Sequence, residues 1–259
     1  MDDILINFSH LILSLTDTRI VTLIATIGFL AISKKTFSKA IILILITMPL
    51  NAYLKSIFKI PLNPTIGKIG WAFPSGHMQT AFVFWGIIFW EYKNIIIRFF
   101  VGALMICIGF ALVYLRYHNI IDILGAIGFG LVELMLFKLI TNRKDEAIVP
   151  LLGFLLAWVS LFLINVASKS HNNLWLACGG LFGFSTGYYL TLAQNLKSKT
   201  YITLPLGVAG AVLIYLFAPY LLKQVFKSNV AIFAQFFILT FWVSFAAEKI
   251  ANITNKIKN

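Results

Sequence analysis

Long apolar segments separated by short polar breaks run through this sequence, and they restrict its fold more than any other feature. A helix that crosses a bilayer needs about 20 mostly apolar residues. Nine candidate segments follow one another, at residues 18–33, 39–56, 77–92, 97–116, 119–140, 149–167, 174–192, 201–219 and 229–250. We therefore predict an all-α, polytopic transmembrane helical bundle with about nine spanning helices.

Composition supports lipid as the solvent for most of the chain. Charged residues make up 12% of the sequence and hydrophobic residues 60%, with a mean hydropathy of +0.91. Soluble domains carry about 25% charged residues, so this chain has too few polar side chains to cover a surface in water. The net charge of +12 does not indicate nucleic acid, because the basic residues are scattered singly between apolar segments. We expect the lipid bilayer and a membrane lipid as partners, and no nucleic acid.

The amino-terminal stretch and the two cysteines add smaller constraints. The stretch from Ile4 to Leu15 is apolar but interrupted by polar residues, which predicts an interfacial or half-buried helix. The first residues are acidic and lack the basic region of a cleaved signal peptide. Cys107 and Cys178 lie within apolar segments, where they are expected to pack as small apolar residues rather than bind a metal.

The distribution of Lys and Arg predicts the orientation. If the segment at 18–33 runs inward, 13 of the 21 basic residues lie at the inner side and 8 at the outer side. An excess of basic residues marks cytoplasmic loops. We expect a multi-pass protein of the bacterial inner membrane whose chemical site faces the extracytoplasmic side.

The polar connection from Thr141 to Val149 is the best candidate for a boundary between two parts of the chain. It divides residues 1–141, which contain the motifs described below, from residues 142–259, which contain further apolar segments of unknown role. Within the second part, Gly179, Gly180, Gly183 and Gly187 place small residues at helical spacing. Such spacing predicts a close-packed seam between helices.

Ionisable residues are costly inside or next to a membrane and mark functional sites, and here they cluster. Lys55 follows the segment at 39–56, Pro74-Ser75-Gly76-His77 precedes the next segment, and His118 and Asp122 begin the segment at 119–140. The order of the segments places all three groups at the same membrane face. The cluster therefore predicts one shared site.

The residue types in this cluster suit phosphoryl transfer. A helix that begins at Ser75 and Gly76 would offer backbone N–H groups to an anion, and Lys55 would add a positive charge. His118 and Asp122, four residues apart, would lie on one helical face. A carboxylate there fixes the imidazole tautomer and activates a histidine nucleophile. His77 could then protonate the leaving alcohol as a general acid.

These residues resemble the motifs of the type 2 phosphatidic acid phosphatase family, which includes the lipid phosphate phosphatases. The family pattern is K-x6-R-P, then P-S-G-H, then S-R-x5-H-x3-D, and the resemblance covers roughly residues 50–125. It implies a helical bundle, a phosphohistidine formed on His118 with Asp122 as its partner, and His77 as the acid. Lys55, Ser75 and Gly76 would bind the phosphate. No metal or cofactor is implied.

The sequence departs from the family pattern where two arginines are expected. Leu62-Asn63 stands in place of Arg-Pro in the first motif, and Ala111-Leu112 in place of Ser-Arg in the third. Losing a donor that stabilises transition-state charge typically costs about 10²–10³ in rate. Arg116, one helical turn after Leu112, or Lys59 could replace the missing charge. Alternatively, both could extend to lipid headgroups.

Three functions remain open from the sequence. The first is a phosphatase that acts on a lipid phosphomonoester or diphosphate, which the retained motifs favour. The second is a lipid headgroup or phosphoryl transferase, because a phosphodiester has less negative charge to neutralise than a monoester. The third is a non-catalytic lipid-binding or transport protein.

Two further ionisable residues are excluded from the site. Glu133, ~22 Å along the helix from His118, is expected to pair near the inner surface, and His171 is expected to be solvated.

Overall fold

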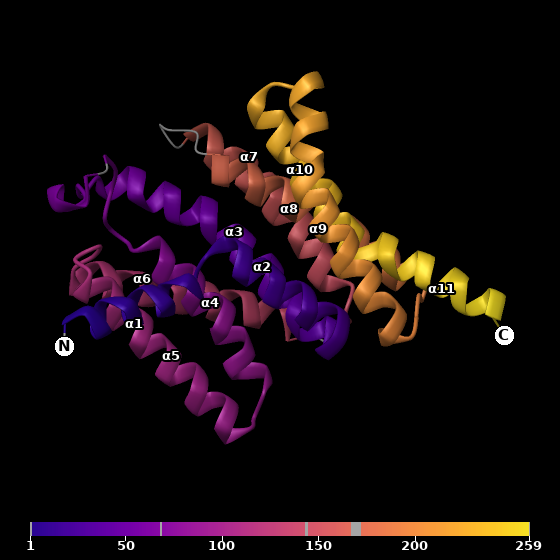
Figure 1. The fold of residues 1–259 in the computed structure, drawn as a ribbon, viewed down its shortest axis with the longest axis horizontal. Helices are drawn as coiled ribbons and strands as arrows, with labels where there is room; N and C mark the ends of the chain where they lie inside the picture. The colour runs from indigo at the N-terminus through magenta and orange to yellow at the C-terminus, as the bar shows by residue number, and fades with distance from the viewer. Residues whose placement is uncertain (1, 68, 143–144, 167–171, 259) are drawn as a thin grey trace.

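The computed structural model describes residues 2–67, 69–142, 145–166 and 172–258, and over these residues the chain is a bundle of helices (Figure 1). The helices in the first part are α1 (Asp2–Ser14), α2 (Thr18–Ile27), η1 (Gly28–Ile32), α3 (Lys34–Phe58), η2 (Pro64–Ile66), α4 (Gly76–Glu91), α5 (Ile95–Tyr114) and α6 (Ile120–Thr141). Those that follow are α7 (Ile148–Val166), α8 (Asn172–Ala193), α9 (Thr200–Val225), α10 (Ser228–Phe241), η3 (Trp242–Ala246) and α11 (Ala247–Lys258). The described residues form no strand beyond one isolated bridge between Pro61 and Trp71. The predicted all-α bundle is confirmed.

Over the residues that the structure describes, each of the nine apolar segments overlaps a helix, but these helices differ in length and polarity. Five are long and apolar enough to cross a membrane: α3, α5, α6, α9 and the continuous run Ser228–Asn255. Three further apolar helices are shorter, at Asp3–Ser14, Ile20–Ile32 and Ile148–Ile164. The structure therefore supports a membrane protein, while the number of nine crossings stays a prediction.

Helix α3 lies between the two parts of the chain. It packs against α4 and α6 on one side and against α7 and α8 on another (Figure 1). The largest buried cluster accordingly contains residues from both parts, among them Phe29, Ile42, Phe184 and Tyr188. The ring of Phe29 meets those of Phe184 and Tyr188 edge-on, at centroid distances of 5.2 and 5.6 Å. Residues on both sides of the polar connection at 141–149 thus share one core, although residues 143–144 lie outside the described ranges.

Two of the glycines of α8, Gly179 and Gly183, form the predicted close-packed seam against α10, while Gly180 faces α3. A Cβ atom added at Gly179 would lie 2.2 Å from the carbonyl oxygen of Phe233, and one added at Gly183 would lie 2.2 Å from that of Phe237. Larger residues at these positions would separate the two helix backbones. The small-residue spacing therefore sets how closely α8 and α10 approach.

Basic residues at the start of α3 form ion pairs with carboxylates from other elements. The pairs are Lys34 with Glu248 of α11 (2.9 Å), Lys35 with Glu146 (3.7 Å) and Lys39 with Glu91 of α4 (2.8 Å). All three lie at the opposite end of α3 from Lys55. These contacts neutralise charge at the predicted inner face of the bundle.

A buried chain of hydrogen bonds joins α3, α4 and α6 and reaches the P-S-G-H segment. Asn51 Nδ2 donates to the carbonyl of Pro74 (3.2 Å) and to Gln79 Oε1 (2.7 Å), and Gln79 Nε2 donates to Glu133. Glu133 also contacts the hydroxyl of Thr47 (2.5 Å). Gln79 belongs to the first turns of α4, at the end that carries His77. Glu133 therefore pairs with neighbouring helices as expected, but the expected place of this pairing near the inner surface is wrong. Distance along α6 does not show which side chains of neighbouring helices reach Glu133.

The number of protons available for these hydrogen bonds suits a protonated, neutral Glu133 side chain. The Thr47 hydroxyl lies 2.8 Å from the Leu43 carbonyl and 2.5 Å from Glu133 Oε2, yet it has one proton to donate. A proton on Glu133 Oε2 would satisfy both contacts, since the acid could donate to Thr47 while its other oxygen accepts from Gln79. Polar side chains that bond across helices stabilise membrane bundles.

We predict that Glu133→Gln keeps most of the stability of the wild type, because an amide can donate to Thr47 and accept from Gln79. Glu133→Leu should lower the midpoint of thermal unfolding, since each interhelical hydrogen bond lost costs about 1 kcal/mol. Thermal unfolding of the purified variants in detergent measures the difference. Equal midpoints for the two variants would contradict a stabilising role for this chain of hydrogen bonds.

Candidate active site

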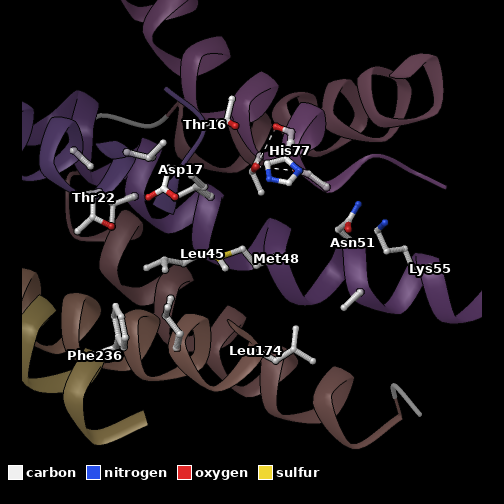
Figure 2. A pocket seen from close by; sticks show the side chains of 18 of the residues that line it. Thr16, Asp17, Thr22, Leu45, Met48, Asn51, Lys55, His77, Leu174 and Phe236 are labelled. Atoms are coloured by element: carbon white, nitrogen blue, oxygen red, sulfur yellow. Dashed lines mark hydrogen bonds between the residues drawn. The ribbon is translucent and has the colours of Figure 1, made fainter. Parts of the chain in front are cut away.

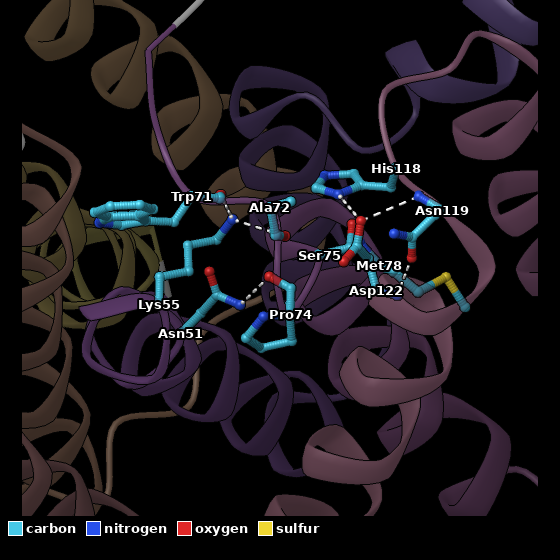
Figure 3. A network of polar contacts seen from close by, with 10 residues as sticks. All are labelled: Asn51, Lys55, Trp71, Ala72, Pro74, Ser75, Met78, His118, Asn119 and Asp122. Carbon is cyan, nitrogen blue, oxygen red and sulfur yellow. Dashed lines mark hydrogen bonds and ion pairs between the residues drawn. The ribbon is translucent and has the colours of Figure 1, made fainter. Parts of the chain in front are cut away.

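The predicted site residues other than Arg116 come together where four helices end at one face of the bundle, and Figure 3 shows Lys55, Ser75, His118 and Asp122 among them. Lys55 lies in the last turn of α3, and Ser75, Gly76 and His77 begin α4. His118 lies in the short connection between α5 and α6, and Asp122 lies in the first turn of α6. Because these helices alternate in direction, their ends meet, as the order of the segments predicted.

Asp122 and His118 contact each other through a capping box rather than along a continuous helix. Asn119 is the N-cap of α6: its Oδ1 accepts from the Asp122 backbone N–H (2.8 Å), and Asp122 Oδ2 accepts from the Asn119 backbone N–H (3.0 Å). The same Oδ2 lies 3.2 Å from His118 Nδ1. The predicted contact is present, but the expected helical stacking is not, because His118 precedes the helix. With the proton on Nδ1, Nε2 keeps a free lone pair.

Burial and charge keep His118 in its neutral form. The side chain is 7% exposed. Burial and the positive charge of Lys55 lower the pKa of His118 from 6.5 to about 4, although the bond to Asp122 opposes both effects. A neutral imidazole with Nδ1–H bonded to a carboxylate is the form that can act as a nucleophile.

The P-S-G-H segment forms the N-terminus of α4 and is attached to α6. The Ser75 hydroxyl caps α4 by accepting from the Met78 N–H (3.4 Å), and the Ser75 N–H donates to the Asp122 carbonyl (3.1 Å). A Cβ atom at Gly76 would lie 3.0 Å from Asn51 Oδ1, so glycine allows α3 and α4 to approach here. Gly76 and exposed His77 line a cavity, whereas Ser75 is buried and outside its lining. Ser75 thus lies where it positions the helix start.

Lys55 is held at the site by the loop that connects α3 to α4. Its Nζ donates to the carbonyls of Trp71 (2.5 Å) and Ala72 (3.2 Å). The loop folds back on itself, since the Leu62 N–H donates to the Gly70 carbonyl and the Ala72 N–H donates to the Ile60 carbonyl. These contacts place the ammonium group beside the cavity that His118 and His77 line.

The two positions where the family has arginine differ in surroundings. Leu62 lies in the folded loop and lines the cavity. Leu112 is fully buried in a cluster with Met78, Ile108 and Ile123. An arginine side chain would therefore reach the cavity from position 62, whereas at position 112 it would require the helices to repack.

Neither proposed replacement for these arginines lines the cavity. Helix α5 ends at Tyr114, and Arg116 follows it in a left-handed conformation (φ 58°) with an exposed side chain. The helical continuation from Leu112 to Arg116 that was expected is therefore absent. Lys59 is also left-handed (φ 50°) and exposed, as the C-cap of α3. The structure does not bring these two residues to the other site residues.

The cavity has a volume of about 870 Å³ and extends from the two histidines along α3 (Figure 2). Among its described lining residues, Lys55 is the sole lysine or arginine, and Asp17, in the turn between α1 and α2, contributes a carboxylate. The rest of the lining is mostly apolar and comes mainly from α2, α3, α8, α10 and the loop between α3 and α4. The cavity thus offers a reactive polar end and a long apolar end.

Several residues of the site were not identified from the sequence. Asn119 could have been found from the N-x-x-D spacing of a capping box before an apolar segment. Asn51 lies one turn before Lys55 on α3, a position that suggests a shared helix face. Asp17 had no local signal, because it reaches the cavity only through packing of α2 beside α3.

Comparison with known families agrees with this geometry. Residues 18–146, about half of the chain, match the model of the PAP2 superfamily. No curated protein and no solved structure matches the chain. The matched range contains α2 to α6 and every residue of the P-S-G-H and H-x3-D motifs. The chain belongs to the PAP2 superfamily, whose activity is of the phosphatase type.

Proposed function

We propose that this protein is a membrane lipid phosphatase, a hydrolase of phospholipid metabolism that cleaves a lipid phosphomonoester or diphosphate through a phosphohistidine on His118. The observation that carries the proposal is the position of His118, whose Nδ1 bonds Asp122 while the ring lines the same cavity as His77 and Lys55. This combination provides a nucleophile, an acid and a cation around one space.

The reaction would proceed in two displacements. Nε2 of His118 attacks phosphorus, the bond between phosphorus and the ester oxygen breaks, and His77 gives its proton to the leaving alcohol. Water then attacks the phosphohistidine and gives a proton to His77, which releases inorganic phosphate and restores His118. Lys55 and the Gly76 backbone at the N-terminus of α4 would stabilise the negative charge on phosphorus.

We also propose that this site faces the extracytoplasmic side of a bacterial inner membrane. The excess of basic residues at the opposite face supports this orientation. Labelling a cysteine placed at exposed Arg116 with a membrane-impermeant reagent on intact cells would decide it, since labelling only after lysis would reverse the orientation.

We predict that His118→Ala abolishes phosphate release, because His118 is the residue proposed to form the covalent intermediate and its Nδ1 is the one bonded to Asp122. Purified protein should release inorganic phosphate from at least one of phosphatidic acid, phosphatidylglycerophosphate and a polyprenyl diphosphate. With labelled substrate, the wild type should trap an acid-labile phosphohistidine that His118→Ala lacks. His10→Ala, at an exposed position of α1, is the matched control and should retain activity. A function that persists unchanged in His118→Ala would instead favour a non-catalytic lipid-binding or transport protein.

We predict that His118 titrates near pH 4 rather than at the 6.5 of an ordinary histidine, because burial and Lys55 both disfavour its protonated form. Removing the cation in Lys55→Met should raise the pKa of His118. The chain has four histidines, so NMR titration of nitrogen-labelled histidine, with the His118 signal assigned from His118→Ala, can measure both values. An ordinary pKa in the wild type, or a decrease in Lys55→Met, would contradict the electrostatic model.

A second candidate function is a headgroup or phosphoryl transferase, and the charge of the cavity favours it. A phosphomonoester carries about two negative charges near neutral pH. Against these, the described lining offers Lys55 as its one lysine or arginine, and it also contains Asp17. A phosphodiester, with one negative charge, fits this balance better. Such an enzyme would form product only when an acceptor alcohol or lipid is supplied.

We predict that Leu62→Arg increases kcat/KM toward phosphomonoesters by up to about 10², because it returns a cation to the cavity lining. Leu62→Met, which changes shape without charge, is the control and should have little effect. Leu112→Arg should lower thermal stability instead, since that side chain is fully buried. If Leu62→Arg changes nothing while wild type transfers phosphate to an added acceptor, the transferase is the correct assignment.

A further inference from the structure

One face of α3 lines the cavity over most of the length of the helix. The lining positions are Ile41, Ile44, Leu45, Met48, Asn51, Ala52, Lys55 and Ser56. Their spacing of three and four residues is that of a single helical face. From Lys55 to Ile41 this face extends ~21 Å, whereas half of a bilayer's hydrocarbon core is ~15 Å thick. The cavity therefore reaches from the phosphate-binding end past the middle of the bundle.

Polarity changes along this face. Lys55 and Asn51 lie at the end of the cavity that the histidines line. Farther along α3, toward its N-terminus, the lining residues are Met48, Leu45 and Ile41. Figure 2 shows Met48 and Leu45 to the left of Asn51 and Lys55 along the same helix. A phosphate ester of a lipid has the same order of a charged head and an apolar chain.

The wall opposite this part of α3 comes from the carboxy-terminal part of the chain. Helix α8 contributes Leu174, Leu176 and Phe184, and the run from α10 into η3 contributes Phe236, Leu239, Thr240 and Val243. Figure 2 shows Phe236 and Leu174 facing the side chains of α3. Phe184 and Val243 are 1% and 3% exposed and belong to the largest core cluster. By their positions along α8 and η3, Phe184 and Val243 lie at the end of the cavity farthest from the histidines and close that end.

We infer that one hydrocarbon chain of the lipid substrate occupies this cavity, and that α8, α10 and η3 limit the chain length it accepts. The inference rests on the proposed function for the identity of the headgroup. Continuity supports it, because the same cavity is lined by His77, His118 and the apolar residues of α3. A hydrocarbon chain gains little free energy when it moves from the bilayer into an apolar cavity, because both surroundings are apolar. A cavity that is closed at its deep end therefore selects chains by their length and shape rather than by affinity. The carboxy-terminal helices would then be a specificity element of the enzyme.

Photo-crosslinking tests occupancy without requiring catalysis. The probe is phosphatidic acid with a diazirine near the end of one acyl chain, reconstituted with full-length His118→Ala in vesicles. We expect the label on cavity residues such as Leu45, Phe184 or Val243, mapped by mass spectrometry. Excess unlabelled phosphatidic acid should compete. Labels confined to lipid-facing residues would overturn the inference, as would equal cavity labelling by a phosphatidylcholine probe, since the cavity would then take any bilayer lipid.

Chain-length dependence tests selection, with two methionine variants as a matched pair. Met48→Trp should obstruct the cavity midway and lower kcat/KM for dioleoyl phosphatidic acid by about tenfold or more, while dihexanoyl phosphatidic acid is hydrolysed as before. Met135→Trp, at an exposed position of α6, should change neither. Equal loss for both substrates in a folded Met48→Trp, or no loss for either, would overturn the inference.

The two measurements separate this inference from the proposed function. Cavity labelling by the phosphatidic acid probe, without hydrolysis by the wild type, would sustain the chain site and refute the phosphatase. Hydrolysis without cavity labelling would sustain the phosphatase and refute the chain site. Thermal unfolding of Met48→Trp, compared with Met48→Ala, checks that any loss comes from obstruction rather than misfolding.

Discussion

The hydrogen bonds of Asp122 hold the reactive end of this molecule together. Its carboxylate accepts from the ring of His118 and from the Asn119 backbone, and its own carbonyl accepts from the Ser75 N–H that begins α4. One residue therefore positions the proposed nucleophile, caps α6 and fixes the helix that carries His77. A buried carboxylate is costly without such partners. Because these bonds satisfy it, the negative charge can remain beside His118 and set its tautomer.

Sequence reasoning predicted that Lys55, the P-S-G-H segment, His118 and Asp122 lie together, as they do, but it described their local structure less accurately. The spacing of His118 and Asp122 predicted their contact, yet the contact arises because Asn119 ends the loop and caps α6, so that His118 lies before the helix. The fold class followed from segment length alone, because about 20 apolar residues have few alternatives to a membrane helix. The role of Glu133 did not follow, since its partners Thr47 and Gln79 belong to other helices and only packing brings them together.

The apolar part of the cavity could not be predicted for a related reason. Residues such as Leu45, Leu239 and Val243 recur at helical spacing, which is the pattern of any buried helix face. Whether such a face meets another helix or borders a space depends on how closely the helices pack. Glycines allow α8 and α10 to pack closely against each other. One face of α3, in contrast, borders the cavity. The difference is a property of the assembled bundle.

The cavity's few cations and its long apolar end have different consequences for catalysis. A chain held beside α3 would fix the position of the phosphate relative to His118, and positioning of this kind lowers the entropic part of a barrier. It would not stabilise charge that develops on phosphorus, because the chain interacts equally in the ground state and the transition state. In the proposed mechanism, Lys55 and the N-terminus of α4 would provide that stabilisation, and Leu62 would add none. Under the proposed function, chain recognition would therefore compensate for a missing arginine in substrate binding, while the chemical step for a doubly charged phosphate would stay slow.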